Sequence, residues 1–150
     1  MARRRRRRAH KLARVRVTLL LCDAAEEVGG KLYVLGGGWG LLHAPDTPLN
    51  LALAILIAVP WDQANEQHEV EAVLVTDDGE RVQINGQELA ASGQFEAGRP
   101  PGLKPGVELN VPLALKFNGI ALAAGGYRWE VFVDGEQEAI APFRVIAGPL

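Results

Sequence analysis

Apolar and polar residues alternate along much of this chain with the period of two that is typical of β-strands. The alternation is clearest at Tyr127–Val133 and at His68–Thr76. Predicted strands recur at intervals of roughly 8–12 residues, with Gly, Pro, Asn and Asp between them. No stretch shows the 3.6-residue period of a long helix. The pattern predicts an all-β fold, a single-domain antiparallel β-sandwich.

Turn residues set the bounds of the remaining elements. Further strands are predicted at Arg14–Cys22, Lys31–Leu35, Leu49–Val59, Glu80–Ile84, Glu88–Phe95, Val107–Phe117 and Glu138–Ile146. Trp39–Leu42 is predicted to resume the second of these past a glycine bulge. One helical turn is predicted at Asp62–Gln67, with Asp62 as its N-cap. Tight turns are predicted at Gly29-Gly30, Asp77–Gly79, Asn85-Gly86 and Asp134-Gly135.

The segment Leu49–Val59 is apolar at nearly every position. Such a run is typical of a strand that is covered on both faces. In a two-layer sandwich one face of each sheet should meet water. The pattern therefore predicts that a loop, the short helical turn or another subunit covers the second face of this strand.

Tyr127 enters a strand directly after the loop Leu122–Gly126. This placement resembles a tyrosine corner, in which a Tyr at the start of a late strand bonds back to upstream backbone. It favours an immunoglobulin-like topology, although the Cys–Trp–Cys core of antibody domains is missing. The alternative is an ordinary buried Tyr at a strand start.

Charge divides the chain into two parts. Residues 1–16 hold nine Lys and Arg and no acid, whereas the rest holds seven Lys and Arg against 18 Asp and Glu, a net charge of −11. A segment of like charges with few apolar residues cannot offset its ordering entropy. Residues 1–14 are therefore predicted to be a disordered arginine-rich arm, and residues 15–150 the β-sandwich domain.

Cysteine content and apolar run length bear on the compartment. Cys22 is the single cysteine, which excludes an intrachain disulfide and a Cys-rich zinc site. The longest apolar run, Leu51–Val59, is far shorter than the roughly 20 residues of a spanning helix. The basic start is not followed by a signal-peptide cleavage pattern. These features predict a cytoplasmic protein with no membrane contact.

Several segments carry a resemblance to a known family. They are Val17–Ala25, Gly30–Trp39, Val59–Trp61, Gly98–Gly106 and Val111–Leu113. Over roughly residues 15–146 the chain resembles a family of small bacterial proteins of unknown function. The resemblance implies a compact β-sandwich with no assigned activity, and it carries over no catalytic or binding residue.

The resemblance also implies that such proteins begin close to the first strand. Val15 is then a candidate true start, read from an alternative initiation codon, which would make the arginine run an annotation artefact. An intact mass that begins at Met1 would refute this hypothesis.

Motifs for catalysis, cofactors and metals are not found. Gly36–Gly38 lacks the Gly-Lys-Ser/Thr ending of a phosphate loop and is interpreted as a bulge or tight turn. His10, His43 and His68 are too scattered to predict a metal site. Cys22, at the end of an apolar strand, is interpreted as a buried, inert thiol. The prediction is no enzyme, no catalytic residue, no cofactor and no metal.

The arm is the feature with the most direct functional meaning. Its basic residues are Arg3, Arg4, Arg5, Arg6, Arg7, Arg8, Lys11 and Arg14. Arginines neutralise phosphates and release counterions, which gives salt-dependent, nonspecific nucleic-acid binding. Two alternatives compete: the arm folds against the acidic body, or the natural protein lacks it.

A second group of residues indicates a protein interface. The candidates are Trp39, Trp61, Arg99, Leu103 and Lys104. The last three lie in a proline-braced loop, and rigid loops on a scaffold are common binding surfaces. Both tryptophans are equally plausible as core residues.

Three functional hypotheses follow. The first is a non-enzymatic module that binds a protein or self-assembles as a homo-oligomer, using Leu51–Val59 together with the interface candidates. The second is a nucleic-acid-associated protein anchored by the arm. The third is a small-ligand binder or enzyme whose site forms only in the fold.

Overall fold

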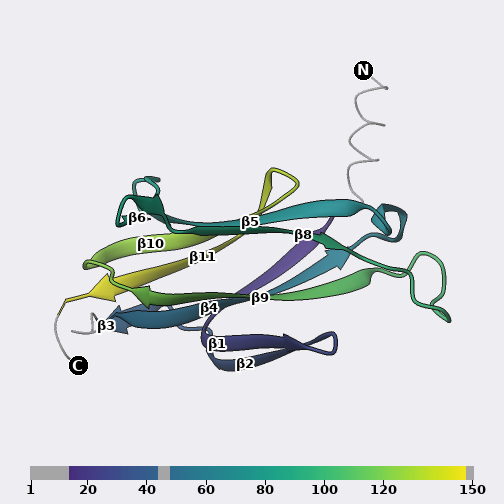
Figure 1. Cartoon of the computed structure of the whole chain (residues 1–150), viewed down its shortest axis with the longest axis horizontal. Helices are drawn as coiled ribbons and strands as arrows, with labels where there is room; N and C mark the ends of the chain where they lie inside the picture. The colour runs from purple at the N-terminus through teal and green to yellow at the C-terminus, as the bar shows by residue number, and fades with distance from the viewer. Residues whose placement is uncertain (1–13, 44–47, 148–150) are drawn as a thin grey trace, which may run out of the picture.

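The computed structural model describes residues 14–43 and 48–147, and it is built almost wholly of β-strands. Two sheets lie against each other, as Figure 1 shows. The predicted arm, apart from Arg14, lies outside the described residues. In the part of the chain that is described, no helix combines the length and apolarity that a membrane span requires.

The first sheet has four strands and the second has five. In spatial order the first contains β2 (Lys31–Gly37), β1 (Arg16–Val28), β4 (Leu49–Val59) and β9 (Leu109–Ile120). The second contains β3 (Leu41–His43), β11 (Glu136–Ile146), β10 (Gly125–Val133), β5 (Gln67–Thr76) and β8 (Ala90–Glu96). All pairs within the two sheets are antiparallel except β3 with β11. The all-β, antiparallel prediction is confirmed.

The main core lies between the two sheets. The odd-numbered residues of β4 and of β10 point into it, because successive side chains of a strand point to opposite faces. The β4 members are Leu51, Leu53, Ile55, Ile57 and Val59. At its centre the rings of Trp129 and Phe117 lie 4.5 Å apart, one from each sheet. The run Leu51–Val59 is thus part of the core, and the hypothesis that it forms an interface is wrong.

The hairpin of β1 and β2 covers the outer face of β4. Its residues Ala25 and Leu32 pack with Cys22, Ala52 and Ala54 in a second apolar cluster. Figure 1 shows the hairpin lying along the face of the first sheet that points away from the second. Alanines on this face let the hairpin approach closely. Both faces of β4 are therefore covered, and the cover is a part of the same chain that the sequence did not indicate.

The tyrosine-corner prediction is confirmed in its geometry. Tyr127 is buried at the start of β10, and its hydroxyl donates to the carbonyl of Ala123 at 2.7 Å. Two predicted tight turns are also present. At Asn85-Gly86 and Asp134-Gly135 both residues have positive φ, as a type I′ hairpin turn demands.

Three local predictions were wrong. Leu41–His43 does not resume β2 but crosses to the second sheet, where β3 runs parallel to β11. Gly38, with φ of +88°, allows the change of direction. Glu80–Ile84 is reduced to β6 (Gln83–Ile84), which pairs with β7 (Gln87–Glu88).

The third concerns the helical turn. It is a 3₁₀ turn, η1 (Trp61–Gln63), which begins one residue before the predicted one. Its N-cap is Pro60 rather than Asp62, and no side chain caps it. A turn this short leaves few backbone donors for a cap to satisfy.

Candidate functional site

Trp61 and Arg99 form a stacked pair at the end of the molecule that holds η1. The guanidinium carbon of Arg99 lies 4.6 Å from the centroid of the Trp61 ring. The same guanidinium donates to the carbonyl of Trp61 from Nη2 at 2.6 Å and from Nε at 3.2 Å. The two hydrogen bonds anchor the guanidinium to the backbone of Trp61 and the stack places it over the ring, so Arg99 is ordered against Trp61 in the free protein.

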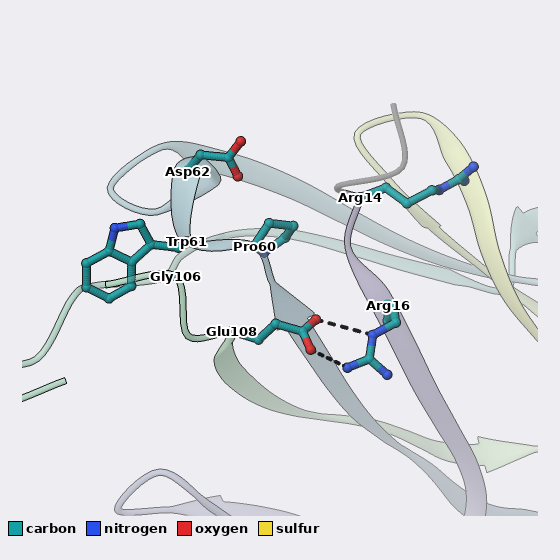
Figure 2. A pocket seen from close by; sticks show the side chains of 7 residues that line it. All are labelled: Arg14, Arg16, Pro60, Trp61, Asp62, Gly106 and Glu108. Atoms are coloured by element: carbon teal, nitrogen blue, oxygen red, sulfur yellow. Dashed lines mark hydrogen bonds and ion pairs between the residues drawn. The ribbon is translucent and has the colours of Figure 1, made fainter. Parts of the chain in front are cut away.

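A hollow of about 610 Å³ lies beside this pair (Figure 2). It is lined by Trp61, Pro60 and Asp62 from one side and by Arg16 and Glu108 from the other. Arg16 binds Glu108 through two bonds, Nη2 to Oε1 at 2.5 Å and Nε to Oε2 at 3.2 Å. The hydrogen bonds from Arg16 lower the pKa of Glu108, so this carboxylate stays ionised.

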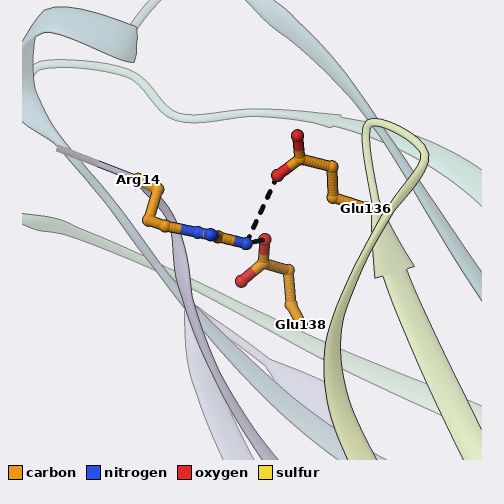
Figure 3. Close-up of polar contacts among 3 residues, drawn as sticks. All are labelled: Arg14, Glu136 and Glu138. Carbon is orange, nitrogen blue, oxygen red and sulfur yellow. Dashed lines mark hydrogen bonds and ion pairs between the residues drawn. The ribbon is translucent and has the colours of Figure 1, made fainter. Parts of the chain in front are cut away.

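Arg14 faces the acidic edge of β11 (Figure 3). Its Nη2 lies 3.3 Å from Oε2 of Glu136 and also contacts Glu138. Arg14 and Arg16 are thus both neutralised by carboxylates of the body. An anionic ligand at this hollow would have to displace glutamates, which argues against an anion site here.

A second hollow, of about 700 Å³, opens on the other side of the proline-rich loop between β8 and β9. Its walls are mainly apolar, with contributions from Phe95, Leu103 and Val107. Glu27, Glu96 and Glu108 also line it. Apolar area combined with charged groups is common at protein-binding surfaces.

His68 connects η1 to the β10–β11 turn beneath this end of the molecule. Only 4% of His68 is exposed, and its Nδ1 lies 2.7 Å from Oδ2 of Asp134. Its Nε2 lies 3.0 Å from the carbonyl of Gln63, and its ring stacks on Phe95. Burial opposes the charge on His68, but the bonds to Asp134 and Gln63 outweigh it and raise the pKa of the imidazole.

The structure brings most of the predicted interface residues to one end. Trp61 and Arg99 touch, while Leu103 and Lys104 lie in the same loop as Arg99. Trp39 lies apart from them, packed edge-to-face on Phe143 with ring centroids 5.7 Å apart. We name the surface formed by Trp61, Arg99 and Leu103 the Trp61–Arg99 surface.

The remaining candidates for chemistry are Cys22 and the possible metal ligands. Cys22 is fully buried, its Sγ lies 3.4 Å from the carbonyl of Ala52, and burial raises the pKa of its thiol. This agrees with the predicted inert thiol. Among residues 14–43 and 48–147, no three His, Cys, Asp or Glu side chains gather as a metal site would require. The predicted nucleic-acid residues Arg3 to Arg8 and Lys11 lie outside the described part.

Sequence reasoning missed the His68–Asp134 pair and the Arg16–Glu108 pair. His68 and Asp134 are 66 residues apart, and Arg16 and Glu108 are 92 apart. Only the pairing of β5 with β10 brings the first two together, and no local motif marks that pairing. Asp134-Gly135 did predict the turn at the end of β10, but nothing in the sequence around His68 indicated that it contacts Asp134.

The fold defines a two-sheet, all-β protein with a stacked aromatic–cationic pair at one end. The chain belongs to a family of unknown function, DUF6941, whose model matches residues 17–146. This confirms the expected membership of a family without assigned activity. The comparison with curated proteins gives no match.

One similar solved structure is that of the Pseudomonas fluorescens alkylpurine DNA glycosylase AlkC bound to DNA containing an abasic site analog. The two are 13% identical, with a TM-score of 0.45. The match covers 89% of this chain but only 30% of that one. Similarity at this level carries no argument about the fold or the function of the present chain.

Proposed function

We propose that the chain is a non-enzymatic module that binds another protein or assembles with itself, and that the Trp61–Arg99 surface contacts a protein partner. The carrying observation is the stack of Arg99 on Trp61, which two hydrogen bonds hold in place. Trp and Arg are enriched among the residues that dominate binding energy at interfaces. A side chain that is already ordered loses less conformational entropy on binding.

The surroundings of the pair support a protein rather than a small anion as the partner. The arginines of the neighbouring hollow are paired with Glu108, Glu136 and Glu138. The second hollow is lined by apolar residues, among them the exposed Leu103, and by glutamates. Such a surface suits a partner segment with an apolar anchor and a basic flank.

A photo-crosslinking residue at position 103 should capture the partner in cells of the native host. We expect one discrete product on a denaturing gel, identified by mass spectrometry. Adding Trp61→Ala should lower its yield about tenfold or more, since a hot-spot truncation costs 2 kcal/mol or more. The measurement is band intensity at matched expression.

Ile140 provides the matched control. It is an exposed apolar residue on β11 of the second sheet. The same photo-residue at position 140 should not yield the product. Identical products from positions 103 and 140, or a yield unchanged by Trp61→Ala, would contradict the proposed surface.

The charge split favours a second candidate, a nucleic-acid-associated protein. Nine of the 16 Lys and Arg lie within residues 1–16, on a chain that is otherwise acidic. The described glutamates neutralise Arg14 and Arg16. The basic residues before position 14 would therefore have to make any contacts with phosphates.

Deleting residues 2–13 tests this candidate. If the arm binds phosphates, the full chain should bind duplex DNA in fluorescence anisotropy, with an affinity that falls by about 10³-fold between about 50 and 200 mM salt. The deletion variant should lose both the binding and its salt dependence. Undiminished binding by the deletion variant would rule out the arm as the anchor.

We further propose that the fold is an immunoglobulin-like sandwich. In support, the second sheet runs β3-β11-β10-β5-β8, and its edge strand β3 is parallel to its neighbour β11, the last strand of the chain. The Tyr127 corner lies at the start of the penultimate strand, as in immunoglobulin-like domains. A bacterial source rests on the family resemblance. A single buried cysteine supports a cytoplasmic location.

A further inference from the structure

The sequence contains two Asn-Gly pairs, Asn85-Gly86 and Asn118-Gly119. An asparagine before glycine loses its side-chain amide readily without an enzyme, because glycine has no side chain to shield its backbone nitrogen from the neighbouring amide carbon. Both pairs are exposed to solvent. The sequence alone therefore gives them equal reactivity, and only the fold can distinguish them.

Asn85-Gly86 is the turn between β6 and β7, and few contacts restrain it. Within the described residues, the Asn85 side chain and the Gly86 N–H take no part in a hydrogen bond. The strands β6 and β7 have two residues each and form a sheet of their own, which projects from the molecule in Figure 1. An isolated two-stranded hairpin is marginally stable, so this turn should open often while the rest of the chain stays folded.

Asn118-Gly119 is held within β9 of the first sheet. The N–H of Gly119 donates to Oδ1 of Asn50 on β4 at 2.9 Å. Phe117 and Ile120, on either side of the pair, are buried in the main core. Freeing the Gly119 nitrogen requires the opening of a strand that is anchored in the core, and such openings cost more free energy than the fraying of a surface turn.

We propose that Asn85 is a site of spontaneous deamidation in the folded protein and that the fold protects Asn118. The Gly86 nitrogen loses its proton to solvent and attacks Cγ of Asn85, which lies next to it in the chain, so the reaction is intramolecular. The new N–Cγ bond closes a succinimide ring while the Cγ–Nδ2 bond breaks. The departing amide takes up a proton and leaves as ammonia, which balances the proton lost from Gly86.

Water then opens the ring at either of its two carbonyl carbons. Hydrolysis at Cγ breaks the N–Cγ bond and leaves an aspartate with the original main chain. Hydrolysis at the main-chain carbonyl carbon leaves an isoaspartate, in which the main chain passes through the side-chain carbon. Either product replaces a neutral amide by a carboxylate, and the net reaction consumes one water and releases one ammonia.

Isoaspartate at position 85 should disturb the hairpin more than aspartate does. It adds a backbone atom to a tight turn whose geometry fixes the register of the strands on either side, here Ile84 opposite Gln87. Ile84 and Leu89 pack against the main core. Loss of the register uncovers that part of the core, so the modification marks aged copies of the chain by a loosened hairpin.

This inference goes beyond the proposed function, because it concerns the β6–β7 hairpin and not the Trp61–Arg99 surface. The full chain is incubated at mildly alkaline pH, and peptide mapping by mass spectrometry follows the deamidated fraction at each asparagine over time. We expect Asn85 to react at least about tenfold faster than Asn118, because the hairpin opens more often than β9.

The same chain in concentrated urea is the matched control, because unfolding removes the hairpin and the sheet together. There the two Asn-Gly pairs should react at similar rates, so a difference in the folded chain reports its structure. Circular dichroism shows whether the chain without urea stays folded. A folded chain in which Asn118 reacts as fast as Asn85, or in which Asn85 is unmodified when the urea control has reacted, overturns the proposal.

Asn50→Ala tests the protection of Asn118. The substitution removes the acceptor of the Gly119 N–H, and Asn50 is itself exposed. The rate at Asn118 should rise about threefold or more, the effect of losing one hydrogen bond, while the rate at Asn85 stays unchanged. An unchanged rate at Asn118 in a folded Asn50→Ala variant overturns the proposed cause of its protection.

Discussion

Replacing Tyr127 by Phe should lower the free energy of unfolding by about 1–3 kcal/mol, the cost of leaving one buried polar partner unsatisfied. The substitution removes the hydroxyl that donates to the Ala123 carbonyl at 2.7 Å. It keeps the ring, which stacks on Phe143 with centroids 5.6 Å apart. The loss should therefore report the hydrogen bond rather than the packing. Urea denaturation, followed by fluorescence, measures it.

Tyr33→Phe is the matched control, because it deletes the same group from the other tyrosine of the chain. Tyr33 is exposed on β2, and its hydroxyl is open to water. Its substitution should change stability by less than about 0.5 kcal/mol. Equal effects of the two substitutions would show that the corner contributes nothing specific to the loop before β10.

The corner also shows which parts of this fold can be predicted from sequence. Tyr127 stands between a glycine pair and a strongly alternating strand, so its position and its burial are local properties. The Asn85-Gly86 and Asp134-Gly135 turns are local as well, because their positive φ angles suit those residues. Elements fixed by near neighbours in the sequence were predicted correctly.

Elements fixed by distant contacts were not. Alternation with the charged Arg128 and Glu130 placed Trp129 on an inner face, whereas Trp61, between Pro60 and Asp62, has no such pattern around it. The partner of Trp61 is Arg99, 38 residues away, so the stacked pair could not be predicted from either residue. The sequence placed Arg99 in a candidate interface because of the prolines around it, but nothing near Arg99 in the sequence indicates its contact with Trp61.

The β1–β2 hairpin is the clearest case of a tertiary effect that overrides a local pattern. The apolar run of β4 required a cover on its outer face, but the alanines there do not identify it. Ala25 and Leu32 provide that cover, and Glu26 contacts Lys116 of β9 across it. Because the hairpin turns one face to the sheet, its other face and its edge are left to solvent. The exposed side chains of the hairpin are thus a consequence of how the core strand is covered.

The stability of the chain should fall as pH rises through the pKa of His68, by about 1 kcal/mol in total. That figure is below the roughly 1.5–3 kcal/mol of a hydrogen bond to a charged group, because the Asp134 side chain is 49% exposed and screened by water. The folded protein raises the pKa of His68, against the effect of burial, through Asp134 and Gln63, with Glu66 adding a smaller attraction. The stabilisation is therefore complete below the unfolded value of about 6.5 and is lost above the folded value.

Asp134 determines how far the pH can fall before the His68–Asp134 pair stops stabilising the fold. Burial opposes its charge, but the bonds from His68 and from the Glu69 amide lower its pKa. Its contribution is complete above the unfolded value of about 3.9 and is lost as pH falls through the folded value. Maximum stability from this pair is thus expected between about pH 4 and 6.5.

Urea unfolding at a series of pH values from about 5 to 9 measures the effect of the His68–Asp134 pair. Asp134→Asn removes the charge and should flatten the decline with rising pH, while His43→Gln, on β3, should not. If the stability of Asp134→Asn still falls as pH rises, another titrating group causes the fall.

Because His68 Nε2 binds the Gln63 carbonyl at the end of η1, loss of the imidazolium also loosens the turn that carries Trp61. Crosslinking through position 103 should then weaken over the same pH range, which would tie the pair to the Trp61–Arg99 surface.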